Sequence, residues 1–348
     1  MYFNVTFLNN LIKIIIPSLI AIYSYYIFNT QHTYINIFYP LAIEDFTINI
    51  IEGDATSSFL NRKLSPYLVI LISKLGFDLE TSYKIFIKIF FLLNSLTFYF
   101  IMISYNLSKL KSSLYLILYN FLICSWFGYL YYPWDFLDII IFLLLGNFIL
   151  KDKPRFYFIC LFIISLLNGE RAILISLFFM FSSINYNKKI TLDYQNFFIC
   201  LVTMIFAIIF ILYFRGYITS SDKVPILVGN EFVLFQNIKN FIFFNWFNHN
   251  FFYSITLIII NIYYVFYFSS FNKKQFKLYA IFLTQLVMVF ISGVIEEVRV
   301  FQFMIPIAIL LFISINEKKL NFSSWKNLNS SYLNLVSRQN GAYKNKLA

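Results

Sequence analysis

Residues 196–214 read NFFICLVTMIFAIIFILYF, a stretch without a single charged side chain. A run of about 18 or more apolar residues predicts a transmembrane helix, because about 20 helical residues cross the hydrocarbon core of a bilayer. Outward from this stretch, similar apolar runs lie near residues 11–28, 86–106, 112–130, 134–150, 156–168, 171–184, 251–270, 278–295 and 299–315. The segment 66–77 is too short to cross, so we expect it to lie at the interface or to re-enter the membrane.

The composition of the whole chain agrees with a membrane location. Of its 348 residues, 60% are apolar and 12% are charged, whereas a soluble domain carries roughly 25% charged residues. A soluble chain of this kind would expose apolar surface on every side. The sequence therefore predicts an all-α, polytopic transmembrane helix bundle of about ten spans.

The basic residues predict how this bundle is oriented. They concentrate in alternate connections, at Lys109 and Lys111, at Lys151, Lys153 and Arg155, at Lys188 and Lys189, at Lys273, Lys274 and Lys277, and at Lys318 and Lys319. With ten spans these connections share one side, which the positive-inside rule makes cytoplasmic together with both termini. The net charge of +11 is therefore attributed to orientation in lipid and not to nucleic-acid binding.

This topology divides the chain into two regions. A single transmembrane domain is expected at 1–315, with long extracytoplasmic loops at about 29–84 and 215–250. The segment 316–348 is expected to be a polar cytoplasmic tail. Cys124, Cys160 and Cys200 lie inside apolar runs and form no CxxC motif, so they are interpreted as small buried hydrophobic residues.

Acidic residues gather on the predicted outer face, first of all in the first outer loop. Glu44, Asp45, Glu52 and Asp54 lie within eleven residues of one another. A loop carboxylate near the bilayer can act as a general base on a hydroxyl nucleophile, so these four are the catalytic candidates. Clustered carboxylates can also bind a divalent cation, for which Glu52 and Asp54 are the candidate ligands. The alternative is a solvated acidic loop.

A second outer feature is Asn168-Gly169-Glu170-Arg171, between two apolar runs. A charge at membrane depth costs roughly 2.5–3.5 kcal/mol on insertion scales unless it is paired or hydrated. Glu170 and Arg171 are therefore binding candidates, and the arginine fork suits a phosphate group. An exposed hairpin turn is the alternative.

Two further features complete the predicted outer site. In Glu296-Glu297-Val298-Arg299, Glu297 and Arg299 are substrate-binding candidates, although Glu296 and Arg299 could form a structural salt bridge. In Tyr132-Pro133-Trp134-Asp135, Asp135 is a candidate, although Trp and Tyr at an interface usually form an aromatic belt. Arg62 is the remaining candidate for substrate or phosphate binding.

Carboxylates and arginines at one interface suit a substrate that combines an anionic phosphate, a polar group and a long apolar tail. A lipid-linked sugar has these properties. A proton-coupled transporter more often buries its ionisable groups near the bilayer midplane, whereas here they cluster near the predicted outer ends of the helices.

The layout resembles the GT-C superfamily of polytopic membrane glycosyltransferases. The resemblance rests on one span, an acidic outer loop with Glu44-Asp45 or Glu52-Gly53-Asp54, the stretch Arg62-Lys63-Leu64-Ser65-Pro66, and many later spans. It implies a polyprenyl-phosphate-linked sugar as donor and a loop carboxylate as the base that activates an acceptor hydroxyl. It also implies that Arg171 or Arg299 holds the donor phosphate.

These patterns lead to three functional hypotheses. The first is a glycosyltransferase of cell-surface glycan assembly on the outer face of a bacterial inner (plasma) membrane. Its expected partners are membrane lipid and a lipid-linked sugar, with no nucleic acid and with a divalent cation as candidate cofactor. The second is a polymerase of O-antigen or exopolysaccharide repeat units. The third is a non-enzymatic lipid or glycan transporter.

Overall fold

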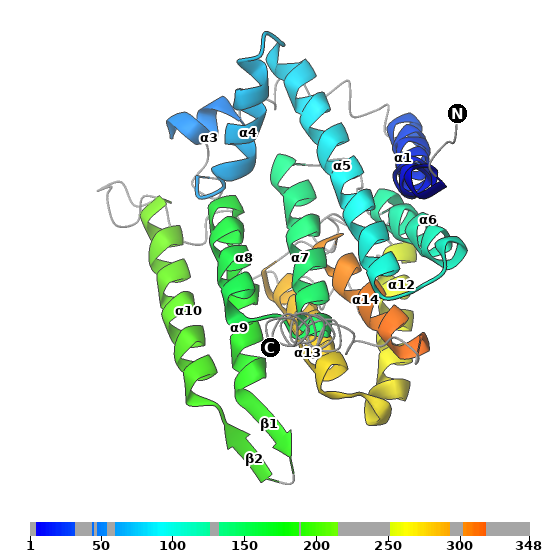
Figure 1. Ribbon diagram of the computed structural model, residues 1–348. Coiled ribbons are helices and arrows are strands. Elements are labelled where there is room, and N and C mark those ends of the chain that lie inside the picture. The colour runs from blue at the N-terminus through cyan, green and yellow to red at the C-terminus, as the bar shows by residue number, and fades with distance from the viewer. Residues whose placement is uncertain are drawn as a thin grey trace, which may run out of the picture.

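The computed structural model describes residues 5–31, 44, 47–53, 60–125, 132–187, 189–214, 251–292 and 302–317. These residues form a helix bundle with one β-hairpin (Figure 1). The elements are α1 (Val5–Gln31), α3 (Ile48–Glu52), α4 (Leu64–Ser73), α5 (Leu79–Ser104), α6 (Lys109–Ser125), α7 (Pro133–Lys151), α8 (Arg155–Asn168), α9 (Ala172–Ser183), β1 (Ile184–Asn187), β2 (Lys189–Leu192), α10 (Tyr194–Phe214), α12 (Phe251–Tyr267), the 3-10 helix η2 (Phe268–Ser270), α13 (Lys273–Ser292) and α14 (Ile305–Asn316).

Within the described ranges, each predicted apolar run coincides with a helix, and the short runs at 156–168 and 171–184 form the separate helices α8 and α9. Three of the described helices, α5, α7 and α10, are long and apolar enough to cross a membrane. The apolar stretch after Pro66 belongs to α4, which is too short to cross. The count of ten spans and the side on which the termini lie stay predictions.

Helix α7 is the centre of the bundle. In an apolar stretch of 18 residues of α7, 83% of the residues are buried. The corresponding share in α10, at the periphery, is 22%. Helix α7 packs against α5, α8, α13 and α14. At Gly146 the absence of a side chain lets α14 approach closely, because a Cβ atom there would lie 2.6 Å from Cδ1 of Leu310. Small residues at such contacts are typical of helix packing in membranes.

Polar side chains join α1, α5 and α6 inside the bundle. The Tyr119 hydroxyl donates to Oδ1 of Asn94 over 2.8 Å, and the Ser95 hydroxyl donates to Oδ1 of Asn120 over 3.0 Å. The amide of Asn120 then donates to the hydroxyl of Ser24 over 3.4 Å. Hydrogen bonds of this kind add about 0.6 kcal/mol each to helix association in a membrane. This accounts for the Asn and Ser residues within these apolar helices.

The β-hairpin is the one departure from a purely helical fold in the described residues. Strands β1 and β2 pair antiparallel, with Ile184 opposite Leu192 and Asn187 opposite Lys189. Polar and apolar residues alternate in both strands, which is the two-residue period of a β-strand. The hairpin lies at the opposite end of the bundle from α3 and α4 (Figure 1).

Lysine side chains from the basic connections contact neighbouring helix ends at the end of the bundle that carries the β-hairpin. Lys111 at the start of α6 pairs with Glu317 after α14, at 2.9 Å. Lys151 at the end of α7 donates to the Ser104 hydroxyl of α5, at 2.7 Å, and Lys274 of α13 donates to the Leu150 carbonyl of α7, at 2.8 Å. The lysines of three separate connections therefore share one end of the structure.

Candidate functional site

The opposite end of α7 carries a cluster of charged side chains, which we call the Arg62–Arg171 cluster. Its members are Arg62, Asp135, Asp138, Glu170 and Arg171. They come from the turn before α4, the first two turns of α7 and the turn between α8 and α9. Helix α7 separates this cluster from Lys151 by roughly 20 Å, at 1.5 Å per residue.

The turn between α8 and α9 depends on Gly169. This residue has φ 157° and ψ −174°, a backbone region that is essentially restricted to glycine. The turn leaves the side chain of Asn168 fully buried and presents Glu170 and Arg171 to different partners. The glycine therefore sets the geometry of the cluster.

Arg171 is held by two buried carboxylates through one nitrogen. Its Nη1 donates to Oδ2 of Asp138 over 2.6 Å and to Oδ1 of Asp135 over 3.2 Å. The two aspartate side chains are 2% and 1% exposed. The guanidinium also lies over the ring of Phe303, 4.4 Å from its centroid. In the part of the chain that the structure describes, neither Nη2 nor Nε of Arg171 forms a hydrogen bond.

Arg62, in contrast, uses its planar fork on a protein carboxylate. Its Nη2 and Nε donate to the two carboxylate oxygens of Glu170 over 2.5 and 3.2 Å, which is the bidentate geometry of a strong ion pair. The guanidinium lies 4.8 Å from the ring centroid of Trp134. Burial disfavours the charged form and is the largest single influence, but the carboxylates of Glu170, Asp135 and Asp138 together outweigh it and raise the pKa of Arg62.

Asn168 connects the elements beneath the two arginines. Its Oδ1 accepts from the Ser65 hydroxyl of α4 over 2.6 Å. Its Nδ2 donates to Oδ1 of Asp138 and to the Trp134 carbonyl, both over 2.9 Å. The side chains of Asn168 and Ser65 are fully buried. This network locks α4, α7 and α8 together and orients the carboxylate that holds Arg171.

A short helix from the first predicted outer loop packs beside the cluster. Ile50 of α3 forms a small buried apolar group with Tyr132 and Trp134, and Trp134 lies under Arg62. The ammonium of Lys63 donates to the carbonyls of Ile50 and Ile51 at the end of α3, and burial lowers its pKa. The acidic loop is thus anchored to the same end of α7 as the arginines.

The structure brings together Arg62, Asp135, Glu170 and Arg171, which the sequence singled out in three separate stretches. Of the catalytic candidates, Glu44 and Glu52 are exposed, and in the described ranges neither contacts an arginine of the cluster. The other predicted site residues, Asp45, Asp54, Glu297 and Arg299, lie outside the described residues.

Three members of this site were missing from the predicted residues. Asp138 follows Asp135 by three positions, a spacing that puts both on one helix face, so the sequence contained a signal for it. Asn168 belongs to the Asn168-Gly169-Glu170-Arg171 stretch that the sequence singled out, but the stretch assigned its amide no role. Phe303 carried no signal, because a phenylalanine in an apolar run is common. Among the described residues, no group of three His, Cys, Asp or Glu side chains could hold a metal ion.

The cluster can recognise an anion by directed hydrogen bonds. Two arginines face three carboxylates, so the formal charge of the cluster is negative and net charge would not attract a phosphate. The open Nη2–Nε edge of Arg171 nevertheless offers the planar fork that binds phosphate oxygens in bidentate fashion. Asp135 and Asp138 fix the direction of this fork. Arg62 cannot serve in the same way without releasing Glu170.

We expect Gly169→Ala to reduce the stability of the protein by about 1–3 kcal/mol, because alanine does not adopt the backbone conformation of this turn without strain. Thermal unfolding in detergent measures the effect. Gly76→Ala is the comparison, since Gly76 also has a positive φ, of 102°, and should lose a similar amount of stability, but it lies at an open turn outside the cluster. A melting temperature of Gly169→Ala equal to that of wild type would contradict the strain assigned to this turn.

Comparison with protein-family models, curated proteins and solved structures finds no match for this chain.

Proposed function

We propose that this chain is a membrane glycosyltransferase that uses a polyprenyl-phosphate-linked sugar on the outer face of a bacterial inner membrane, in the assembly of a cell-surface glycan. The observation that carries the proposal is the open edge of Arg171, whose third nitrogen is held by the buried Asp135 and Asp138. A preorganised donor pair of this kind stabilises a charge that develops on a leaving group. The acidic loop anchored through Ile50 supports a carboxylate base nearby.

In the proposed reaction, a loop carboxylate accepts the proton of an acceptor hydroxyl. The hydroxyl oxygen forms a bond to the anomeric carbon of the donor sugar, and the bond from that carbon to the phosphate oxygen breaks. The electron pair leaves with the polyprenyl phosphate, whose oxygens are held by Arg171. The candidates for the base are Glu44, Asp45, Glu52 and Asp54, and a divalent cation bound by Glu52 and Asp54 is a candidate cofactor.

The test is a mass-spectrometric profile of lipid-linked sugars in cells that lack this protein, complemented with single alanine variants. We expect a lipid-linked donor to accumulate, and wild type to clear it. One or two of Glu44→Ala, Asp45→Ala, Glu52→Ala and Asp54→Ala should fail to do so. Glu80→Ala is the matched control, because Glu80 is a half-exposed carboxylate paired with Lys84 outside the cluster.

Three results would contradict the proposal in different ways. Full clearance by all four variants would exclude the loop carboxylates as the base. Accumulation of single repeat units, with loss of long chains, would assign the polymerase function instead. Movement of a lipid-linked sugar across the membrane by the purified protein, without a new glycosidic bond, would assign the transporter function.

A further inference from the structure

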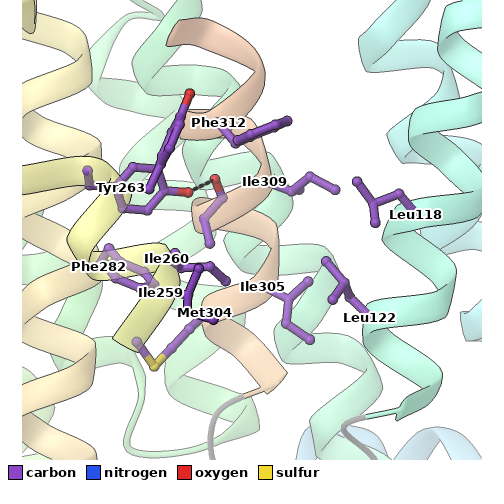
Figure 2. A pocket seen from close by; sticks show the side chains of 12 residues that line it. Leu118, Leu122, Ile259, Ile260, Tyr263, Phe282, Met304, Ile305, Ile309 and Phe312 are labelled. Atoms are coloured by element: carbon purple, nitrogen blue, oxygen red, sulfur yellow. Dashed lines mark hydrogen bonds between the residues drawn. The ribbon is translucent and has the colours of Figure 1, made fainter. Parts of the chain in front are cut away.

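An apolar groove runs along α14 between α6 and α12 (Figure 2). It holds a volume of about 250 Å³. Its walls come from α6, α12, α13 and α14, and include Leu118, Ile259, Phe282, Met304, Ile309 and Phe312. The two tyrosine hydroxyls of its lining are engaged with protein groups: that of Tyr264 donates to the Ala308 carbonyl over 2.5 Å, and that of Tyr263 accepts from Nδ2 of Asn316 over 2.9 Å. A groove of this character accepts a hydrocarbon chain.

A buried amide lies beyond one end of this groove. Gln285 of α13 is fully buried, and in the described part of the chain neither its Nε2 nor its Oε1 has a hydrogen-bond partner. It lies three residues after Phe282, so both are on the same face of α13. A buried polar group without a partner requires an explanation, and a ligand that supplies the missing hydrogen bonds is such an explanation.

The pairing of α13 with α14 shows which end of the groove this is. Nε2 of Gln275 donates to the Ser314 carbonyl over 2.9 Å, and the two helices run antiparallel. Counted ten residues from that contact, about 15 Å at 1.5 Å per residue, Gln285 of α13 is expected to lie level with Met304, the N-cap of α14. Met304 lines the groove, and its neighbour Phe303 lies against Arg171. The amide therefore lies at the end of the groove that is nearest to the Arg62–Arg171 cluster.

We propose that the α14 groove binds the hydrocarbon chain of the phosphate-bearing lipid substrate, and that Gln285 hydrogen-bonds to the polar group at the head of that chain. The identity of this lipid as a substrate rests on the proposed function. An apolar groove along α14, an unpaired buried amide one turn beyond Phe282, and an arginine against Phe303 follow one another in the order of the groups in such a lipid. Arg171 receives the phosphate, and the chain extends along α14 toward Phe312.

The test uses the full chain in nanodiscs with a photoactivatable isoprenyl phosphate, and with the same compound ending in an alcohol. We expect the phosphate probe to label peptides of α12 and α14. Leu118→Trp and Ile259→Trp, which narrow the groove from its exposed edges, should lower labelling about tenfold. The matched controls Ile117→Trp and Ile262→Trp replace similarly exposed residues of the same helices outside the groove and should keep wild-type labelling.

Gln285→Leu separates a ligand contact from a structural role. We expect it to raise the melting temperature of the protein without either probe by about 2 °C, since it removes an unsatisfied amide. It should also lower labelling by the phosphate probe about tenfold and leave labelling by the alcohol unchanged. A lower melting temperature with unchanged labelling would overturn the assignment of Gln285.

Equal labelling of the groove variants and their controls would overturn the proposal that the groove binds the hydrocarbon chain. Labelling spread over exposed residues of α10 would overturn it as well. This assay contains no sugar and measures no transfer. Its failure is therefore distinguishable from failure of the glycosyltransferase proposal, which the profile of lipid-linked sugars tests.

Discussion

Arg171→Lys should lower glycosyl transfer about 100-fold, a loss of about 2.7 kcal/mol in transition-state stabilisation. Lysine keeps the positive charge and can still reach Asp138, but it is a point charge without a planar fork. It therefore loses the Nη2–Nε edge that we assign to the leaving phosphate. The rate of product formation by purified protein, with donor at saturation, measures the effect.

Arg62→Lys is the matched control. Arg62 already uses Nε and Nη2 on Glu170, so the phosphate does not depend on its fork. We expect this variant to keep transfer within about tenfold of wild type, with a loss of stability in place of a loss of rate. Equal losses of rate in the two variants would contradict the assignment of the phosphate to Arg171 and not to Arg62.

Asp138→Ala should reduce the free energy of unfolding by about 1–3 kcal/mol, because Nη1 of Arg171 loses its shorter hydrogen bond, while Asp135 still balances the charge of the guanidinium. The same substitution removes an acceptor from the amide of Asn168, which bridges α4, α7 and α8. Unfolding in detergent, followed by thermal melting, is the measurement. Glu80→Ala, which removes an exposed i,i+4 pair with Lys84, should cost under about 0.5 kcal/mol.

A triple variant separates folding from function at this position. Arg171 pairs with both Asp135 and Asp138, so removing the arginine together with Asp138 alone would leave the buried Asp135 without its cation. Asp135→Asn, Asp138→Leu and Arg171→Met together replace all three charges and should therefore recover most of the stability lost in Asp138→Ala. Transfer should remain abolished, because no phosphate-binding fork is left. Recovery of transfer in the triple variant would show that the charged group has only a structural role.

The limits of helices such as α7 and α10 follow from local sequence. The run at 134–150 corresponds to α7 (Pro133–Lys151), and the run at 196–214 corresponds to α10 (Tyr194–Phe214). These limits follow from the length of uninterrupted apolar sequence and from the polar residues at its ends, which are local properties. The hairpin at 184–192 was missed, because its strands are short and adjoin longer helical runs.

The partners of the charged residues in the candidate site do not follow from local sequence. Glu170 and Arg171 are adjacent in sequence, and both are binding candidates from the sequence. In the fold Glu170 pairs with Arg62 of the turn before α4, while Arg171 turns to Asp135 and Asp138 of α7. Arg62 uses its Nη2–Nε edge on Glu170, whereas Arg171 is held through Nη1 alone. This difference depends on long-range pairings, which residue spacing in the sequence does not reveal.

The sequence by itself determined that the chain is a helical bundle of membrane character and which charged residues are unusual within it, because apolar length and the cost of a buried charge are properties of single segments. Only the tertiary structure decided that Arg62, Asp135, Glu170 and Arg171 share one end of the bundle, and that Asp138, Asn168 and Phe303 complete their surroundings. It alone showed, for the described residues, that the buried amide of Gln285 has no hydrogen-bond partner and that an apolar groove runs along α14. The physical reason is that helix rotation and packing, which set these contacts, minimise the free energy of the whole bundle and not of any one helix.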